Sequence, residues 1–162
     1  MIRTLMMAAL LTLAACNDGG VMREIERAEK ARADAVEDPV TLPSGVIVQF
    51  HSRGPDQTLP RPSGRAGVLV HYEASLASDG TVVDSSLRRG QPAEFGLADM
   101  IGGFREAVMQ MRPGDEIIAT LPPELAYGAA GNPPAIPPNA TMRFRIQLIA
   151  FQEADGVVVS AQ

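Results

Sequence analysis

The chain has 162 residues, of which 46% are hydrophobic and 20% charged, and its formal net charge at pH 7 is -5. This composition is typical of one folded domain with a hydrophobic core and excludes a disordered chain. Because phosphate binding needs clustered cations, the lack of a basic block argues against a nucleic-acid partner. With two His and one Cys, the sequence holds neither a disulfide framework nor a clustered Cys/His zinc site, and we expect no metal.

Residues 1–15 are predicted to be a secretory signal peptide. Arg3 is followed by an uncharged run over residues 5–15 that ends in small side chains. That run is shorter than the roughly 20 residues that a transmembrane helix needs, so a permanent membrane span is disfavoured.

The only cysteine, Cys16, directly follows Leu13-Ala14-Ala15. This segment resembles a bacterial lipobox, in which the cysteine becomes the first mature residue and carries lipid. The resemblance implies lipidation of Cys16 and a lipid-anchored protein of the bacterial cell envelope that faces the periplasm. The alternative is an ordinary signal peptide that ends near a free thiol.

Residues 16–40 are predicted to hold the lipidated cysteine, a spacer and a short helix. Residues 21–37 are rich in Ala, Glu, Arg and Lys and contain no Gly or Pro, which favours a helix. The apolar stripe of Ile25, Ala28 and Ala35 is thin. A solvated spacer and a weak homodimerisation helix therefore remain alternatives.

Residues 41–152 are predicted to form an α+β domain, and residues 153–162 a C-terminal tail. Turn residues Asp79-Gly80 predict a hairpin between the second and third strands. After Gly102-Gly103, apolar residues from Phe104 to Met111 recur at i, i+3, i+4 and i+7, which predicts one short amphipathic helix. Apolar and β-branched runs predict strands at residues 46–50, 68–76, 81–83, 115–121 and 141–151.

The connection between the last two predicted strands is unusually long. Residues 122–140 contain six prolines together with Tyr127-Gly128 and Gly131, so the loop is expected to be stiff but irregular. A connection of this length between adjacent strands is more often functional than incidental.

Four groups of short motifs are spread over this predicted domain. They are Val70-His71-Tyr72 with Asp79-Gly80 and Asp84-Ser85-Ser86; Ile101-Gly102-Gly103-Phe104 leading to Met111-Arg112-Pro113-Gly114; Leu125-Ala126-Tyr127-Gly128; and Ile136-Pro137-Pro138-Asn139-Ala140-Thr141. In order and spacing they closely resemble the FKBP-type peptidyl-prolyl cis-trans isomerases. The resemblance implies a strongly bent antiparallel β-sheet wrapped around one short α-helix, with an apolar pocket between them. It also implies an isomerase that acts on proline-containing polypeptides without covalent chemistry or a cofactor.

The resemblance assigns the pocket residues. Phe104 would form the floor, and the Tyr127 hydroxyl and the Ile101 N–H would hold substrate carbonyls. Asp84, expected to be the sole carboxylate at the wall, would bond to Tyr72 or Tyr127. The remaining substrate-binding positions would be Val83, Phe95, Met100, Ala126, Ile136 and Phe144.

Structural roles remain open for several of these residues. Phe104 is also consistent with plain core packing, Tyr127 with loop packing, and Asp84-Ser85-Ser86 with local turn capping through side chain to backbone bonds. His71 alternates with Val70 and Tyr72 on the predicted strand, and we interpret it as structural.

The sequence departs from the family pattern at four pocket positions. Val83 and Ala93 stand where aromatic residues are usual, Ala135 is small at an aliphatic position of the lip, and Asn132 replaces a His. We therefore expect a wider, shallower pocket, an altered preference for the residue before proline, and poorer macrolide binding. The alternative function is a non-catalytic, chaperone-like binder of extended Pro-containing chains on the same fold.

Overall fold

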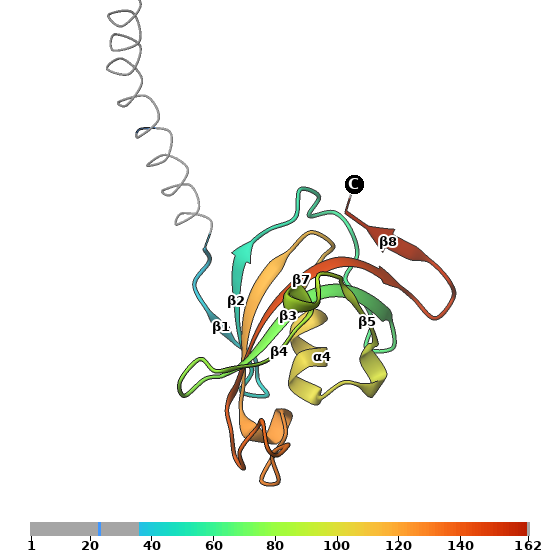
Figure 1. The fold of residues 1–162 in the computed structure, drawn as a ribbon. Coiled ribbons are helices and arrows are strands. Elements are labelled where there is room, and N and C mark those ends of the chain that lie inside the picture. The colour runs from blue at the N-terminus through green and yellow to red at the C-terminus, as the bar shows by residue number, and fades with distance from the viewer. Residues whose placement is uncertain (1–22, 24–35, 162) are drawn as a thin grey trace, which may run out of the picture. The chain divides into compact units, whose positions relative to one another are not determined.

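Figure 1 shows the fold in the computed structural model, which describes residue 23 and residues 36–161. The predicted signal peptide, Cys16 and most of the predicted helix 21–37 lie outside the described residues. In the part that is described, no helix has the length and apolar character needed to cross a membrane.

The compact unit extends beyond the predicted domain bounds on both sides, since it starts at Val36. Val36 and Glu37 end the predicted helix, yet neither is helical, and the Glu37 N–H donates to the Phe50 carbonyl at 3.0 Å. At the other end, the predicted tail contains a strand, β8 (Val158–Ser160), which pairs with the long strand β7 (Met142–Gln152).

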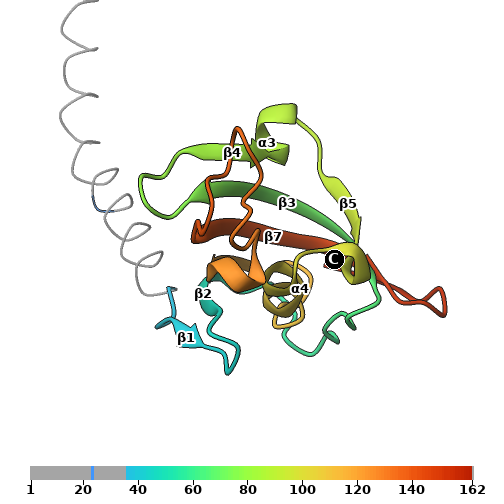
Figure 2. The same cartoon turned by 90° about the horizontal axis from the view of Figure 1, so that it is seen from below.

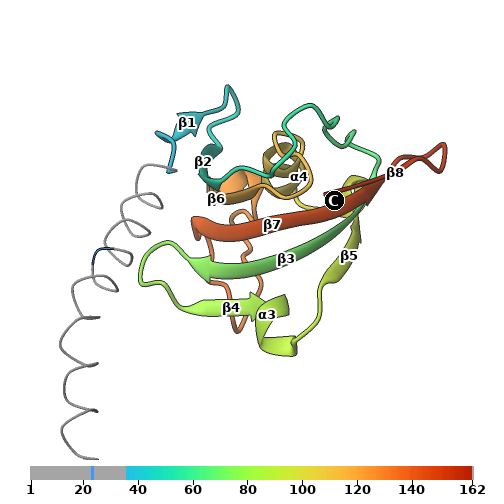
Figure 3. The same ribbon diagram turned by 90° about the horizontal axis from the view of Figure 1, so that it is seen from above.

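The described strands form one eight-stranded sheet in which every pairing is antiparallel. The order is β1-β2-β6-β7-β3-β4, with β5 also on β3 and β8 on β7. Figures 2 and 3 show the sheet curving around helix α4 (Gly102–Val108), which confirms the predicted α+β class. The other strands are β1 (Val40–Thr41), β2 (Ile47–Ser52), β3 (Gly67–Leu76), β4 (Val82–Ser85), β5 (Ala93–Gly96), β6 (Glu116–Leu121) and β7 (Met142–Gln152).

All five predicted strands are present as β2, β3, β4, β6 and β7, and the predicted hairpin joins β3 to β4. The predicted helix ends at Val108, earlier than Pro113-Gly114 suggests. Further short elements have no counterpart in the sequence prediction, because segments of two to four residues are too short to display a period. They are β1, β5, β8, helix α3 (Ser86–Arg89) and the 3-10 helices η1 (Leu97–Asp99) and η2 (Pro123–Leu125).

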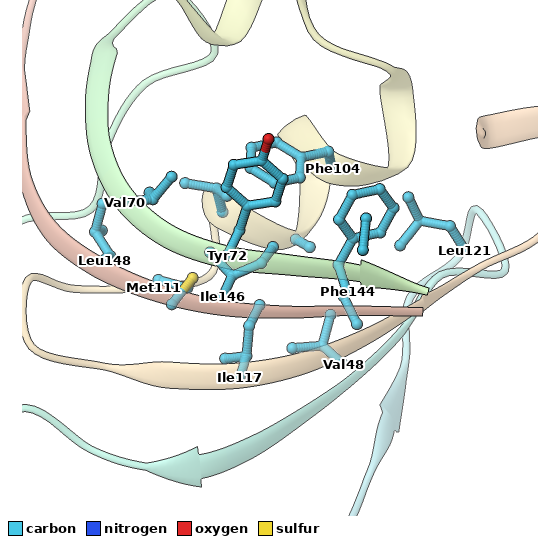
Figure 4. Packing of buried hydrophobic residues seen from close by; sticks show 14 of the residues in the cluster. Val48, Val70, Tyr72, Phe104, Met111, Ile117, Leu121, Phe144, Ile146 and Leu148 are labelled. Carbon is cyan, nitrogen blue, oxygen red and sulfur yellow. The ribbon is translucent and has the colours of Figure 1, made fainter. Parts of the chain in front are cut away.

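The hydrophobic core lies between α4 and the concave face of the sheet. Burial alternates along β3 and β7, as expected for strands with one covered face. Figure 4 shows Phe104 above side chains that point inward from the strands, among them Tyr72, Ile146 and Phe144.

Gly103 lets α4 approach the sheet closely. A Cβ at this position would lie 2.5 Å from Cγ of Leu121 and 3.0 Å from the carbonyl oxygen of Leu125. Both distances are below normal contact, so the residue must be glycine for the helix to pack against β6 and η2 as it does. This packing places Phe104, the next residue, fully inside the core.

Candidate active site

A cavity of about 500 Å³ opens between α4, the loop 122–140 and the neighbouring strands. It is larger than the hollow of about 420 Å³ at the start of β3 and the end of β7, and its volume is typical of small-ligand sites. The lining residues are Tyr72, Ala74, Val83, Asp84, Phe95, Asp99, Met100, Ile101, Phe104, Tyr127, Asn132, Ala135, Ile136 and Phe144.

Nearly all the candidate site residues of the described chain line this one cavity. The exception is Ala126, which follows η2 and packs against the hydrophobic core. The role of Ala126 in substrate binding, next to the lining residue Tyr127, stays a prediction. Ala93 likewise packs against the core, whereas Asn132 and Ala135 both line the cavity. Cys16 lies outside the described residues.

Asp84 is not the only carboxylate at the wall, contrary to the expectation from sequence. Asp99 also lines the cavity, at the end of η1 and directly before Met100 and Ile101. Sequence reasoning missed Asp99 because the short 3-10 turn gives no periodic signal. The turn carries this carboxylate to the cavity because Leu97, at its start, is fully buried.

The cavity has an aromatic floor and back wall. The ring centroids of Tyr72 and Phe95 lie 5.4 Å apart, those of Phe95 and Phe104 5.9 Å, and those of Phe104 and Phe144 5.6 Å. Each pair is edge-to-face, the arrangement that the quadrupoles of aromatic rings favour. This run of four rings holds Phe104 rigidly at the base, so Phe104 belongs to the core and to the cavity at once.

Tyr72, Asp84 and Arg89 form a polar network at the rim. The Tyr72 hydroxyl donates to Oδ2 of Asp84, and Arg89 donates to Oδ1 of the same carboxylate. A second guanidinium nitrogen of Arg89 donates to the Tyr72 hydroxyl at 3.0 Å. Sequence reasoning missed Arg89, whose position follows from helix α3, capped by the side chain of Ser85. Asp84 therefore bonds to Tyr72, and the Ser85 cap shows that the capping interpretation also holds.

The network fixes the charge states of its members. Burial acts to raise the pKa of Asp84, but hydrogen bonds from Tyr72 and Arg89 and the charge of Arg89 outweigh it and lower that pKa. Burial and the bond to Asp84 raise the pKa of Tyr72. At neutral pH the carboxyl is therefore ionised and the phenol protonated, which suits the donor and acceptor roles observed.

Two hydrogen-bond donors belong to residues that line the cavity and have no partner among the described residues. Within residues 36–161 no hydrogen bond engages the Tyr127 hydroxyl or the backbone N–H of Ile101. Burial, with the negative charge of Asp84, raises the pKa of Tyr127 and keeps its hydroxyl protonated. A polar molecule that enters the cavity can thus accept hydrogen bonds from both groups.

The loop 122–140 is held in place by its own backbone. Asn132 and Ile136 exchange hydrogen bonds of 2.8 and 3.0 Å, which close a small hairpin. Gly131 has a φ of +64°, and a Cβ there would lie 2.5 Å from the Ile136 carbonyl oxygen. The tight turn at Gly131 brings Ile136, which is almost fully buried, into the cavity wall.

His71 lies outside the cavity. Its Nδ1 is 3.2 Å from Oγ of Ser86, and that hydroxyl also accepts from the Tyr72 N–H at 2.8 Å. Ser86 is fully buried and ties α3 to β3. His71 thus takes part in a structural contact, as its place on the strand predicts.

Comparison with known proteins identifies the family. The family model described as FKBP-type peptidyl-prolyl cis-trans isomerase matches residues 60–149, more than half of the chain. The chain belongs to the FKBP-type peptidyl-prolyl cis-trans isomerase family. The aromatic cavity, the loop 122–140 and the two unused donors all lie within or directly beside the span that this FKBP-type model matches.

Relatives and solved structures agree with this family. Peptidyl-prolyl cis-trans isomerase FKBP1A of Xenopus laevis is 40% identical over 110 residues, which cover 67% of this chain and 99% of that protein. Peptidyl-prolyl cis-trans isomerase Mip of Coxiella burnetii is 40% identical over 113 residues, 70% of this chain and 47% of that protein. A solved peptidyl-prolyl cis-trans isomerase from Pseudomonas syringae aligns with a TM-score of 0.65 at 31% identity, covering 80% of this chain and 92% of that one. The chain spans about half of the length of several curated relatives that it matches.

Proposed function

We propose that the chain is a peptidyl-prolyl cis-trans isomerase that accelerates rotation about Xaa-Pro bonds in polypeptides. The observation that carries this proposal is the aromatic cavity faced by two unused hydrogen-bond donors, the Tyr127 hydroxyl and the Ile101 N–H. A proline ring packs on Phe104 while the two donors hold carbonyls of the substrate backbone.

The chemistry requires no bond to break. Amide resonance sets a rotation barrier of about 18–20 kcal/mol, and uncatalysed isomerisation takes tens to hundreds of seconds. In the twisted transition state the resonance is lost and the amide is less dipolar than in either planar form. An apolar cavity therefore destabilises the planar states relative to the twisted one, which lowers the barrier. Each tenfold gain in rate needs about 1.4 kcal/mol of such selectivity.

The test is NMR exchange on short Xaa-Pro peptides with the purified full-length chain. Acceleration by the chain is expected, with a rate roughly three- to tenfold lower in Tyr127→Phe, because that variant lacks one hydrogen bond to the substrate. Val158→Ala, on exposed strand β8, is the control and is expected to match the unaltered chain. Peptide binding without acceleration would contradict the proposal and support the chaperone-like alternative.

Phe104→Leu provides a second test of the floor. Because Phe104 is fully buried, its replacement also weakens the core, so the fold must be checked by circular dichroism before the rate is read. A folded Phe104→Leu chain with an unchanged rate would show that the ring is core alone.

We also propose that Cys16 carries lipid and anchors the protein in the bacterial envelope, facing the periplasm. The lipobox-like residues Leu13 to Cys16 support this, and stable anchoring would need two or more acyl chains. Intact mass of the membrane-extracted protein is expected to show a chain that starts at acylated Cys16. In Cys16→Ser the acyl mass should disappear, and an acylated Cys16→Ser chain would contradict the proposal.

For residues 21–35, which leave out the non-helical Val36 and Glu37, we propose a helical segment that either sets the reach from the membrane or pairs weakly with a second copy. The Ala-rich, thin apolar stripe supports no more than a weak homodimer. The size of the protein in solution separates the two roles.

A further inference from the structure

Of the acidic side chains that line the cavity, one is paired with a cation and one is not. The only charged side chains in the described lining are Asp84 and Asp99. The charge of Asp84 is offset by the ion pair with Arg89. Asp99 is solvent-exposed, and the salt bridges formed within residues 36–161 do not include it.

The position of Asp99 is fixed by the fold. Leu97, two residues earlier, is fully buried, and its N–H donates to the Ala66 carbonyl at 2.9 Å. The Met100 N–H donates back to the Leu97 carbonyl at 3.3 Å and closes the 3-10 turn. Asp99 thus lines the cavity from a rigid turn, with its Oδ2 beside Gly96, where an added Cβ would lie 3.1 Å from it.

Asp99 also lies close to a point of substrate attachment. Ile101, which lines the cavity and whose N–H makes no hydrogen bond within residues 36–161, follows Asp99 by two residues. A polypeptide carbonyl bound at that N–H brings its neighbouring side chains within reach of the Asp99 carboxylate. Because the cavity walls are apolar and no lining cation offsets the charge, the field of Asp99 acts on those side chains.

We propose that Asp99 is a specificity-determining residue that selects polypeptides with Lys or Arg next to the isomerised proline and disfavours those with Asp or Glu there. This inference rests on the proposed isomerase activity and adds the charge class of its substrates. The interaction is a partly exposed ion pair with the substrate, so its effect on kcat/KM is modest and sensitive to salt.

The experiment compares capped peptides that carry Lys, Leu or Glu before proline, with the purified full-length chain and NMR exchange as the readout. The Lys peptide is expected to have a kcat/KM roughly three- to tenfold higher than the Glu peptide, from one attraction gained and one repulsion avoided. This Lys-to-Glu ratio should fall toward one in Asp99→Asn and invert in Asp99→Lys.

Asp38→Asn is the matched control, because it changes the net charge by the same amount at an exposed carboxylate that does not line the cavity. The Lys-to-Glu ratio should not change in this variant.

Salt provides a test that needs no variant. The screening length is about 10 Å at an ionic strength of 0.1 M, so raising the ionic strength well above this value should bring the Lys-to-Glu ratio closer to one. If no peptide, including the Leu peptide, is accelerated, the proposed isomerase activity fails. If the Leu peptide is accelerated but the ratio is near one, or is the same in Asp99→Asn, the proposal for Asp99 alone is overturned.

Discussion

At the scale of single residues, the pKa values of Asp84 and Tyr127 are both shifted away from neutral pH. The pKa of Asp84 is lowered, because the hydrogen bonds from Tyr72 and Arg89 and the charge of Arg89 outweigh the effect of burial. The pKa of Tyr127 is raised by burial and by the charge of Asp84. Both histidines of the chain lie outside the cavity lining. Neither Asp84 nor Tyr127 therefore changes its charge in the pH range between the low pKa of the carboxyl and the high pKa of the phenol.

The expected pH profile follows from these directions. Because the pKa of Asp84 is lower in the folded state than in the unfolded state, its ionisation stabilises the fold at pH values above the ordinary pKa of about 3.9. This stabilisation is lost as the pH falls through the lower pKa of the folded state. The isomerisation rate constant should thus be flat from about pH 5 to about pH 9, where the phenol is still protonated. In Arg89→Ala the acid limb should move to higher pH, because Asp84 loses its cation. A limb near pH 6.5 in the unaltered chain would instead implicate a histidine.

Val83 tests the wall of the cavity. Its side chain lines the cavity where the family usually has an aromatic residue, so Val83→Phe should add apolar contact with a proline-containing ligand. We expect kcat/KM for apolar peptides and the affinity for a macrolide such as rapamycin to rise, each roughly two- to tenfold. Val82→Phe is the matched control, since Val82 is the neighbouring residue on β4 and does not line the cavity. NMR exchange and calorimetric titration measure the two quantities, and if neither changes in Val83→Phe, this position is not part of the binding wall.

At the scale of elements, the site depends on how closely α4 packs on β6. An Ala in a helix normally stabilises it by about 0.5–1 kcal/mol relative to Gly. In Gly103→Ala, however, the Cβ would lie 2.5 Å from Leu121 and 3.0 Å from a backbone oxygen, and overpacking of this kind costs about 1–3 kcal/mol. We expect a lower urea midpoint for Gly103→Ala. Gly67→Ala should leave the midpoint unchanged or raise it, because the nearest atom to its Cβ, the Gln152 carbonyl oxygen, would be 3.9 Å away. A midpoint that rises in Gly103→Ala would contradict this account of the packing.

The long elements could be predicted from sequence, and the short ones could not. Alternation along β3 and β7 and the apolar spacing from Phe104 to Met111 extend over enough residues to display a period. Strands β5 and β8 and the turn η1 have four residues or fewer, and long-range pairing decides their conformation. For the same reason the site was only partly predictable: motif positions identified Tyr72 and Phe104, whereas Asp99 and Arg89 reach the rim from short elements.

At the scale of the whole molecule, the segment before the sheet is integrated into the fold from Val36 onward. The Glu37 N–H bonds to Phe50, the Glu37 carboxylate pairs with Arg53, and Val40 pairs with Val48 across β1 and β2. The Glu37–Arg53 pair is partly exposed and contributes little, so the backbone pairing accounts for most of the effect. A chain that starts at Thr41 should therefore melt roughly 3–6 °C below one that starts at Val36.

The chain that starts at Val36 also makes the size measurement interpretable. If residues 21–35 only set the reach from the membrane, a chain that starts at Asn17 and the chain that starts at Val36 should both be monomers by light scattering. If the segment pairs weakly with a second copy, the chain that starts at Asn17 alone should gain mass as its concentration rises, because association through a thin Ala-rich stripe saturates only at high concentration. A chain from Val36 that also dimerises would exclude the helical segment as the interface. Because this chain retains the pairing between β1 and β2, loss of the dimer in it cannot be attributed to a weakened fold.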